Sequence, residues 1–240
     1  MAITIKSERE IELMAEAGKI LERVHNELEK ALHPGMSTKD IDTLGEKIIR
    51  SYGCIPSFLN YNGYPASICV SVNQEVVHGI PDKHRIIHEG DIVSLDAGVI
   101  YKGYHSDAAR THAVGEVSEE AKKLIQVTKE CFFEGIKYAK AGNHLFDISG
   151  AIGRYAEERG YGGVRDLCGH GIGTALHEAP EIPNYEVGRK GVKLRPGMTL
   201  AIEPMINIGT YEVDWLDDDW TVVTRDGSLS AHYENTIMIN

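Results

Sequence analysis

Two segments of the chain repeat one pattern, and each ends in a carboxylate. Residues 88–96 (HEGDIVSLD) align with residues 195–203 (RPGMTLAIE), so that Asp96 corresponds to Glu203. The same offset relates Gly35, Asp40, Ile41 and Gly53 to Gly142, Asp147, Ile148 and Gly160. We interpret this as an internal duplication that brings two acids together near a pseudo-twofold axis. Clustered carboxylates are costly to bury unless a cation neutralises them. Two unrelated strands that each stop at a polar residue are the competing interpretation.

A predicted hairpin over residues 91–111 adds a third acid. Its strands are rich in valine, leucine and isoleucine, and Lys102-Gly103 is a plausible turn. Asp96 and Asp107 are an odd number of residues apart, so a hairpin with an even-numbered loop places both side chains on one face, opposite or diagonal. A solvated pair of aspartates is the alternative for these two residues alone.

Further candidate residues lie in the second half. His170 stands between Gly169 and Gly171, where the backbone of a neighbour can approach closely, and His177 follows it. His78, within the segment VHGIP, is a weak counterpart of His170 in the first half. Glu203 precedes a proline, as at the end of a strand, and Glu234 lies in a predicted terminal strand over residues 230–239.

Four carboxylates and one imidazole make a hard, oxygen-rich ligand set. This set favours Mn²⁺, Fe²⁺, Co²⁺ or a similar ion over a structural zinc, which would recruit thiolates. Four acids are too many for one small cation with an open position, so two metals fit better. Two ions about 3.5–4 Å apart can activate water and polarise a carbonyl, which is hydrolytic chemistry.

Composition narrows the remaining function classes. The 240 residues carry a formal net charge of −11, which argues against a nucleic-acid-binding surface. No apolar stretch approaches the roughly 20 residues that span a bilayer, and the acidic N-terminus lacks the apolar core of a signal peptide. We therefore expect a cytoplasmic protein. Because no C-x-x-C spacing occurs, we expect reduced, mostly buried thiols at Cys54, Cys69, Cys131 and Cys168.

The elements that must position these residues follow an α+β plan. A capping box at Ser7 and Glu10 opens a helix that ends near His33. A second helix runs from Ser37 or Thr38 to Gly53, and the plan repeats with helices over about 118–140 and 145–159. Strands follow each helix pair, which predicts one curved antiparallel sheet backed by helices. No Pro-, Gly- or Ser-rich linker separates the halves. We expect a single catalytic domain, residues 1–240, with repeats of about 1–115 and 116–240.

Five segments together resemble type I methionine aminopeptidase, a metallopeptidase of the pita-bread fold. The segments are residues 73–81 (NQEVVHGIP), 91–107, 169–180 (GHGIGTALHEAP), 197–205 (GMTLAIEPM) and 230–236. Each is of moderate specificity alone, but their order and spacing are highly specific and cover nearly the whole chain. The resemblance implies the pita-bread fold, with two related helix-helix-strand halves.

The resemblance also implies a dinuclear site. Asp96 would chelate one divalent ion, His170 and Glu203 the other, and Asp107 and Glu234 would bridge both. The implied reaction removes the N-terminal methionine from nascent proteins and peptides with a small second residue, by attack of metal-bound hydroxide on the methionine carbonyl.

The remaining roles come from the same resemblance. Glu203 would be the general base, His177 would stabilise charge on the carbonyl oxygen, and His78 would contact the amide beyond the scissile bond. The methionine pocket would comprise Phe58, Tyr61, Tyr64, Cys69 and Trp220, together with His78 and His177. An aromatic and thiol-lined slot suits a thioether, although core packing also explains these residues. A surface or structural role is expected for His25, His33, His84, His88, His105, His112, His144 and His232.

The implied context is a cytoplasmic monomer that acts on nascent polypeptide N-termini, with possible ribosome docking, no direct nucleic-acid role and no membrane contact. Three departures from the family pattern are visible: Asn235 stands where histidine is usual, Phe58 where a smaller residue is common, and the chain stops at Asn240, before a further short strand. The first affects the surroundings of the ligands and the second narrows the pocket.

Two other functions remain as alternatives. Proline-directed hydrolysis, as in aminopeptidase P and prolidase, shares the fold and the ligands, but those proteins normally carry a large extra N-terminal domain. A binding module that has kept the fold and lost its metals is the other. Such modules typically lose several ligands, and every expected ligand is present here.

Overall fold

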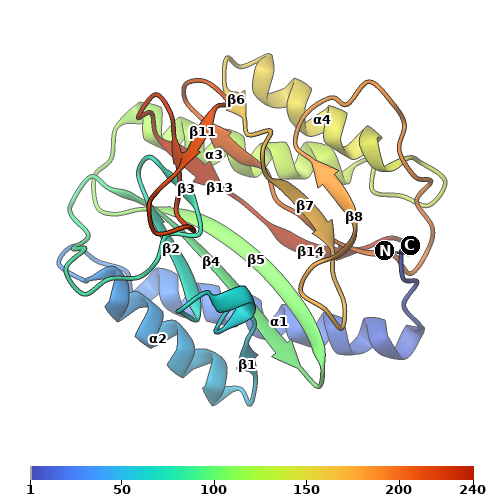
Figure 1. Ribbon diagram of the computed structural model, residues 1–240, viewed down its shortest axis with the longest axis horizontal. Helices are drawn as coiled ribbons and strands as arrows, with labels where there is room; N and C mark the ends of the chain where they lie inside the picture. Colours follow the sequence, from blue (N-terminus) through green and yellow to red (C-terminus); the bar gives the residue numbers. More distant parts are fainter. Residues whose placement is uncertain (1) are drawn as a thin grey trace.

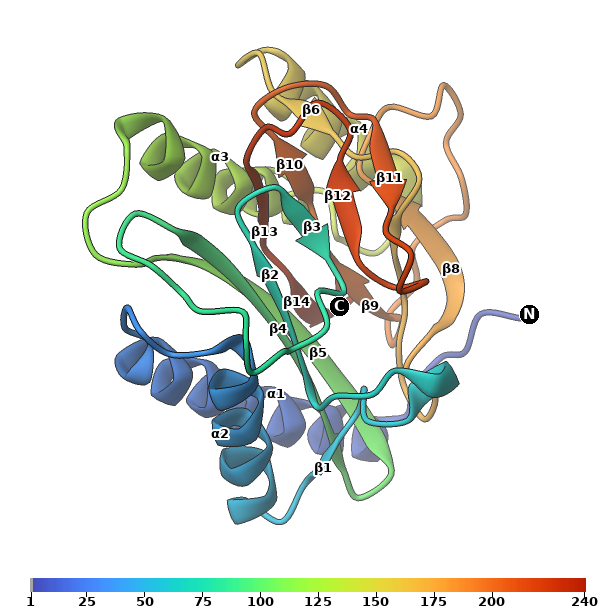
Figure 2. The ribbon, with the colours of Figure 1, turned by 60° about the vertical axis from the view of Figure 1, so that its left-hand side comes forward.

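Two pairs of α-helices cover a layer of strands from opposite ends of the molecule (Figures 1 and 2). The computed structural model describes residues 2–240. Helix α1 spans Glu8–Ala31 and α2 spans Thr38–Ser51, while α3 spans Glu119–Ile136 and α4 spans Leu145–Glu157. The predicted helices are therefore present. The second pair ends two to four residues earlier than expected, because Lys137 and Glu158 already cap them.

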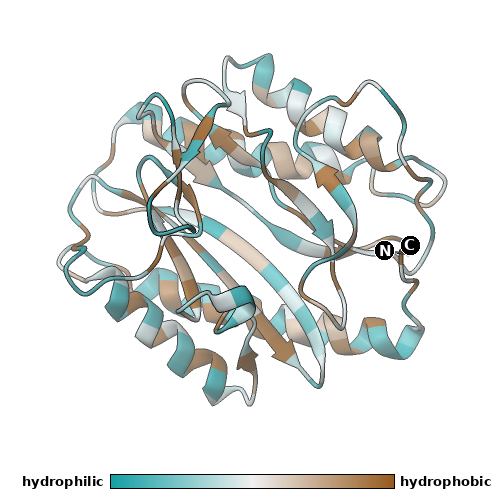
Figure 3. Ribbon diagram, viewed as in Figure 1, coloured by the Kyte–Doolittle hydropathy of each residue, from teal (hydrophilic) through white to brown (hydrophobic). Residues whose placement is uncertain are grey.

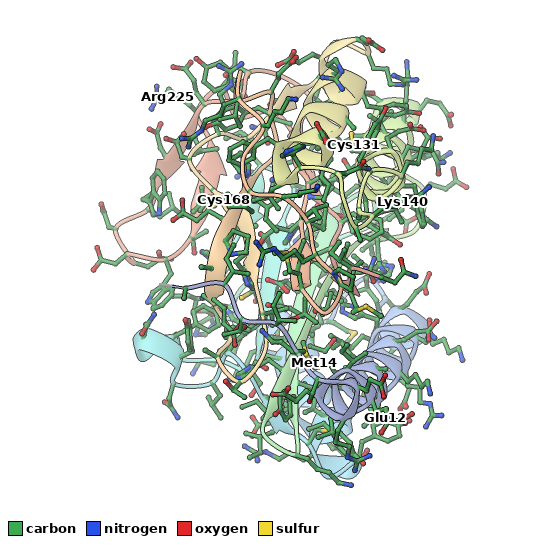
Figure 4. The ribbon with its side chains drawn as sticks, turned by 90° about the vertical axis from the view of Figure 1, so that its right-hand side faces the viewer. Glu12, Met14, Cys131, Lys140, Cys168 and Arg225 are labelled. Carbon is green, nitrogen blue, oxygen red and sulfur yellow. The ribbon has the colours of Figure 1, made fainter. Side chains whose placement is uncertain are left out.

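Capping boxes and apolar stripes account for the first helix pair. Ser7 and Glu10 form the box that opens α1, and Ser37 and Asp40 form the one that opens α2. Along α1 the buried residues recur at helical spacing, so one stripe faces the strands. Figure 4 shows Met14 on the inner side of α1 and Glu12 on its outer side. The same division of apolar and polar faces is visible on the other helices (Figure 3).

The strands come in two sets that follow the two helix pairs. The first set is β1 (Ile55–Pro56), β2 (Ile68–Val72), β3 (Glu75–Val77), β4 (Ile92–Tyr101) and β5 (Tyr104–Ala113), with the short 3₁₀ helix η1 (Tyr61–Gly63) after β1. The second set is β6 (Gly162–Gly163), β7 (Cys168–Gly171), β8 (Glu178–Pro183), β9 (Thr199–Ile202), β10 (Met205–Asn207), β11 (Val213–Trp215), β12 (Val222–Thr224), β13 (Ser230–His232) and β14 (Asn235–Met238).

The β4–β5 hairpin confirms the predicted turn and side-chain parity. Lys102 and Gly103 connect the strands with φ of 49° and 87°, as a two-residue primed turn requires. Asp96 pairs with Ala109 and Gly98 pairs with Asp107, so the two aspartates are diagonal neighbours on one face. The hairpin therefore brings two carboxylates to one side of the strand layer.

Backbone pairing arranges the strands of the curved antiparallel layer in four regular ladders. Their orders are β1–β4–β2 with β5 beside β4, then β13–β10–β6, β11–β12–β3 and β14–β9–β7–β8. Breaks in the regular ladders fall at Glu203-Pro204 and at Glu234. Glu234 and Ala109 nevertheless exchange two backbone hydrogen bonds, of 3.0 and 3.4 Å, which join the two halves beside β5. The α+β class is confirmed, and the antiparallel layer is continuous through this pair.

The apolar core lies under both helix pairs. One cluster packs α1 and α2 on β2 and β4 and contains Leu21, Ile41 and Leu95, while another packs α3 and α4 on β9 and β10 and contains Leu124 and Ile202. All four cysteines are free and three are buried, as predicted. Among the helices of residues 2–240, none has the length and apolarity needed to cross a membrane.

We predict that His25 makes folding pH-dependent. Its ring is buried between α1 and β5, where Nε2 donates to the Ala108 carbonyl at 2.8 Å, and burial lowers the pKa to about 3. The unfolded chain therefore binds more protons between pH 6.5 and 3, so stability falls as pH falls through that window. Lowering the pH from 7 to 5 should cost about 2 kcal/mol through this residue.

Urea denaturation of the metal-free protein and of His25→Gln at both pH values isolates this effect. The variant should lose about 2 kcal/mol less than the parent between pH 7 and pH 5. Equal losses in the two proteins would show that His25 does not contribute to the pH dependence.

Candidate metal centre

Five potential ligands from both halves line one cavity. They are Asp96 on β4, Asp107 on β5, His170 on β7, Glu203 just after β9 and Glu234 between β13 and β14. The predicted set is thus brought together. The register explains it: Asp96 lies opposite Ala109, and Ala109 is bonded to the backbone of Glu234, so the two carboxylates stand in one row across three chain segments.

The distances between these groups are those expected of ligands that share ions. His170 Nε2 lies 3.6 Å from Glu203 Oε1 and 3.9 Å from Asp107 Oδ2. Ligand atoms of Asp107, His170 and Glu234 all lie within 4.8 Å of one another. Atoms bound at about 2.0–2.2 Å to one ion are spaced by about 3–4.4 Å. The centre therefore requires little rearrangement to hold a cation.

The two glycines beside His170 are required by close packing. A Cβ at Gly169 would collide with the carbonyl oxygen of Ala201, and a Cβ at Gly171 would collide with that of Ala179. The Nδ1–H of His170 donates to the Gly171 carbonyl at 2.9 Å, which leaves Nε2 as the nitrogen that can bind a metal. This explains the Gly-His-Gly signal in the sequence.

Burial shifts the pKa of every member of the centre in the direction that favours the neutral form of the group. Burial, with repulsion from neighbouring carboxylates, raises the pKa values of Asp96, Glu203 and Glu234 well above their ordinary range. Burial also raises the pKa of Asp107 to about 7 and lowers that of His170 to about 3. The acids are thus held together at an energetic cost that a cation would offset, and the imidazole is in the neutral form that binds metals.

The carboxylate oxygens themselves show that divalent cations fit here. Asp96 Oδ1, Asp107 Oδ1 and Glu234 Oε1 are buried, and none has a hydrogen-bond partner within residues 2–240. Buried polar atoms without partners are rare in folded proteins and call for an ion or a water. Oxygen atoms with one imidazole nitrogen are suitable ligands for Mn²⁺, Fe²⁺ or Co²⁺.

An apolar pocket adjoins the ligands in the same cavity, which encloses about 150 Å³. All the predicted pocket residues line it, namely Phe58, Tyr61, Tyr64, Cys69, His78, His177 and Trp220. Tyr64 donates to the Gly79 carbonyl at 2.9 Å, and its ring meets Trp220 edge to face at 5.1 Å. The pocket walls are therefore held by both a hydrogen bond and aromatic packing.

His177 is oriented by Tyr61 at the border between pocket and ligands. The Tyr61 hydroxyl lies 2.7 Å from His177 Nδ1, and the His177 ring is 4.2 Å from the His170 ring. If the hydroxyl donates to Nδ1, the ring proton is on Nε2 and can be donated to a bound group. Burial lowers the pKa of His177, which favours this neutral donor.

Two cavity residues, Asn62 and Leu176, were not among the predicted site residues. His232, for which a surface or structural role is expected, is buried and approaches both Glu203 and Glu234 at 3.8 Å. Its position two residues before Glu234 was a usable signal, because alternate residues of an extended chain share a face. Asn62 and Leu176 carry no such signal. Asn235 binds Arg110 through Oδ1 at 2.6 Å.

The sequence and the fold are similar to those of known metallopeptidases. Residues 12–240 match the model of metallopeptidase family M24. The methionine aminopeptidase of Clostridium acetobutylicum is 59% identical over 237 residues, which cover 99% of this chain and 95% of that protein. The crystal structure of methionine aminopeptidase from Thermotoga maritima superposes with a TM-score of 0.97 at 46% identity, covering 100% of this chain and 96% of the other.

A more distant likeness concerns a longer protein. The Xaa-Pro dipeptidase of Bacillus anthracis superposes with a TM-score of 0.77 at 28% identity. The match covers 98% of this chain but 59% of the dipeptidase. The similarity is therefore weaker in both sequence and geometry than that to the methionine aminopeptidases.

Replacing Asp107 by asparagine should separate two effects of the acid cluster, namely its destabilisation of the metal-free protein and its binding of metal. The substitution removes one of four neighbouring buried carboxylates, so metal-free Asp107→Asn should be at least as stable as the parent at pH 7. The parent should gain about 2.7 kcal/mol at Mn²⁺ concentrations 100 times its Kd, and the variant should gain little. Thermal denaturation with and without Mn²⁺ measures both effects. Equal metal-induced stabilisation of the two proteins would exclude Asp107 from the ligands.

Proposed function

The chain belongs to metallopeptidase family M24, and we propose that it removes the N-terminal methionine from nascent proteins and peptides whose second residue is small. The observation that carries this proposal is one cavity whose lining combines two kinds of side chain. Five potential metal ligands line it together with an aromatic pocket and the thiol of Cys69, which pairs with Asp96 across β2 and β4. A scissile carbonyl at the ligands would leave the first side chain in the pocket.

We propose two divalent ions, with Mn²⁺, Fe²⁺ and Co²⁺ as the best candidates. Asp96 would hold one ion, His170 and Glu203 the other, while Asp107 and Glu234 bridge both. This division is supported by the position of Asp107 within reach of His170 on one side and diagonal to Asp96 on the other. When bound, the ions would supply activated water and polarise the substrate carbonyl.

Three side chains of this protein would move or hold protons during the reaction. Glu203 would accept the proton of the attacking water. His177 would donate Nε2–H to the carbonyl oxygen as negative charge develops there. His78 would contact the amide after the scissile bond; it lies beside Trp220 at the pocket wall.

The pocket would select methionine by shape and polarizability. Tyr64 and Cys69 are buried, and Phe58 is 7% exposed, so the slot excludes water when filled. An unbranched thioether adapts to such a slot and makes favourable contacts with aromatic edges. Substrates one methylene different lose only about 1–3 kcal/mol, so slow turnover of leucyl or norleucyl peptides is expected.

We further propose one catalytic domain, residues 1–240, built from two related halves. The corresponding glycines Gly53 and Gly160, which follow α2 and α4, have φ of 71° and 81°. Gly90 and Gly197 also correspond, with φ of 93° and 85°. These similar backbone conformations support the repeat of about 1–115 and 116–240. The family resemblance supports a monomer that acts in the cytoplasm on nascent chains. The net charge of −11 supports the absence of a direct nucleic-acid role.

Replacing His177 by alanine should reduce kcat far more than metal binding. A lost hydrogen bond to the transition state costs about 10²–10³ in rate. Steady-state kinetics of a Met-Ala peptide, together with metal analysis of the same samples, measures both. Tyr61→Phe, which keeps the imidazole and removes its partner, should have a smaller effect. Metal loss in parallel with activity would make His177 a ligand or a structural residue instead.

The second residue of the substrate should decide turnover. Mass spectrometry of peptides incubated with metal-reconstituted protein should show cleavage of Met-Gly, Met-Ala and Met-Ser peptides and little cleavage of Met-Lys and Met-Phe peptides, because the crowded site leaves little room beyond the scissile bond. Asp107→Asn serves as the inactive control, and an Xaa-Pro peptide tests proline-directed hydrolysis. Comparable turnover of Met-Ala and Met-Phe, or faster turnover of Xaa-Pro, would contradict the proposed specificity.

A further inference from the structure

We propose that His232 is a positioning residue of the metal centre, which holds the carboxylates of Glu203 and Glu234 in place through its Nε2–H. The inference rests on the metal centre proposed above. It adds a second imidazole, from the end of β13, to a site in which His170 was the one expected histidine.

Glu203 lies between two imidazoles. His170 Nε2 is 3.6 Å from Glu203 Oε1, and His232 Nε2 is 3.8 Å from Glu203 Oε2. The same nitrogen of His232 is 3.8 Å from Glu234 Oε2. One oxygen of Glu203 therefore faces the histidine of the metal site, and the other faces His232. A donor in this position can fix which oxygen is presented to a cation.

The His232 ring needs a partner that these carboxylates can provide. The residue is 2% exposed, and neither ring nitrogen has a hydrogen-bond partner within residues 2–240. Leaving a buried N–H without an acceptor is unfavourable. An ordinary N–H···O hydrogen bond is about 2.9 Å long, so each 3.8 Å distance exceeds it by about 0.9 Å. A rotation of either carboxylate would bring its oxygen within hydrogen-bond distance of Nε2. Carboxylates that bind metals are commonly oriented by such donors.

The backbone of His232 is held on two sides, which fixes the point from which its ring extends towards the acids. The His232 N–H donates to Thr111 Oγ1 at 2.8 Å, and the Thr111 hydroxyl lies 2.9 Å from the His232 carbonyl. His232 also pairs with Met205 in the β10–β13 ladder. Glu203 and Met205 lie on either side of Pro204. The same short segment therefore carries the ligand Glu203 and the start of β10, the strand that pairs with His232.

The side chains nearby favour a donor role over direct ligation. In His170, Nδ1 carries the ring proton and donates it to the Gly171 carbonyl, so Nε2 is left unprotonated and can bind a metal. No carbonyl or carboxylate accepts from Nδ1 of His232 in the same way within the described residues, so nothing fixes Nε2 as an unprotonated ligand atom. With the proton on Nε2, the ring points a donor at two carboxylate oxygens.

Calorimetric titration with Mn²⁺ tests the inference through metal affinity and not through turnover. Removing a donor that orients metal ligands typically weakens metal binding by about 10–100-fold. His232→Ala should show this loss, whereas His232→Gln, whose amide also donates, should bind Mn²⁺ as tightly as the parent. His112→Gln is the matched control, because His112 is a largely buried histidine that does not line the metal cavity. Its affinity should not change.

Visible absorption of the Co²⁺-loaded proteins separates orientation from ligation. An unchanged spectrum in His232→Gln supports the positioning role. Equal weakening in the alanine and glutamine variants with an altered spectrum would make His232 itself a ligand and overturn it, as would parent-like affinity in His232→Ala. His232→Leu, which fills the volume, replaces the alanine variant if that one does not fold. Failure of the parent to bind Mn²⁺ would instead overturn the proposed metal centre, and the inference with it.

Discussion

Four largely buried carboxylates stand beside one another in this protein, and the fold must hold them against their mutual repulsion. Asp96, Asp107, Glu203 and Glu234 repel each other, and burial raises the pKa of each. A fold can maintain such a group when backbone pairing fixes each acid and a cation offsets the charge. Here the fixed positions come from a tight hairpin and from backbone pairing between the two halves.

The helices and the segments that line the cavity have different roles. The helices and the apolar clusters beneath them stabilise the strand layer, whereas the ligands come both from regular strands, as Asp96 and Asp107 do, and from irregular points between strands. Glu203 and Glu234 both stand where a ladder is interrupted. At these points the backbone turns, so an acidic side chain can face the cavity without facing a neighbouring strand. The pocket residues are likewise of both kinds: Cys69 lies within β2, whereas Tyr61 lies on η1 and His177 in the loop before β8.

Sequence patterns predicted the residues that a regular element positions. The alternation of side chains along a strand predicted that Asp96 and Asp107 share a face. The glycines around His170 predicted a close approach of neighbouring backbone, and the structure has two carbonyl groups there. The division of the strands into four ladders could not be predicted, because it depends on pairing between segments far apart in the chain. The position of His232 beside Glu203 and Glu234 could not be predicted for a related reason, because these two acids belong to segments that meet only in the folded protein.

Anomalous diffraction from crystals soaked in Mn²⁺ would locate the bound ions. We expect two manganese peaks about 3.5–4 Å apart, enclosed by Asp96, Asp107, His170, Glu203 and Glu234. A single peak within the same ligands would keep the metal centre and remove its dinuclear character. Manganese bound elsewhere, with these carboxylates protonated and paired to one another, would contradict the proposed metal centre.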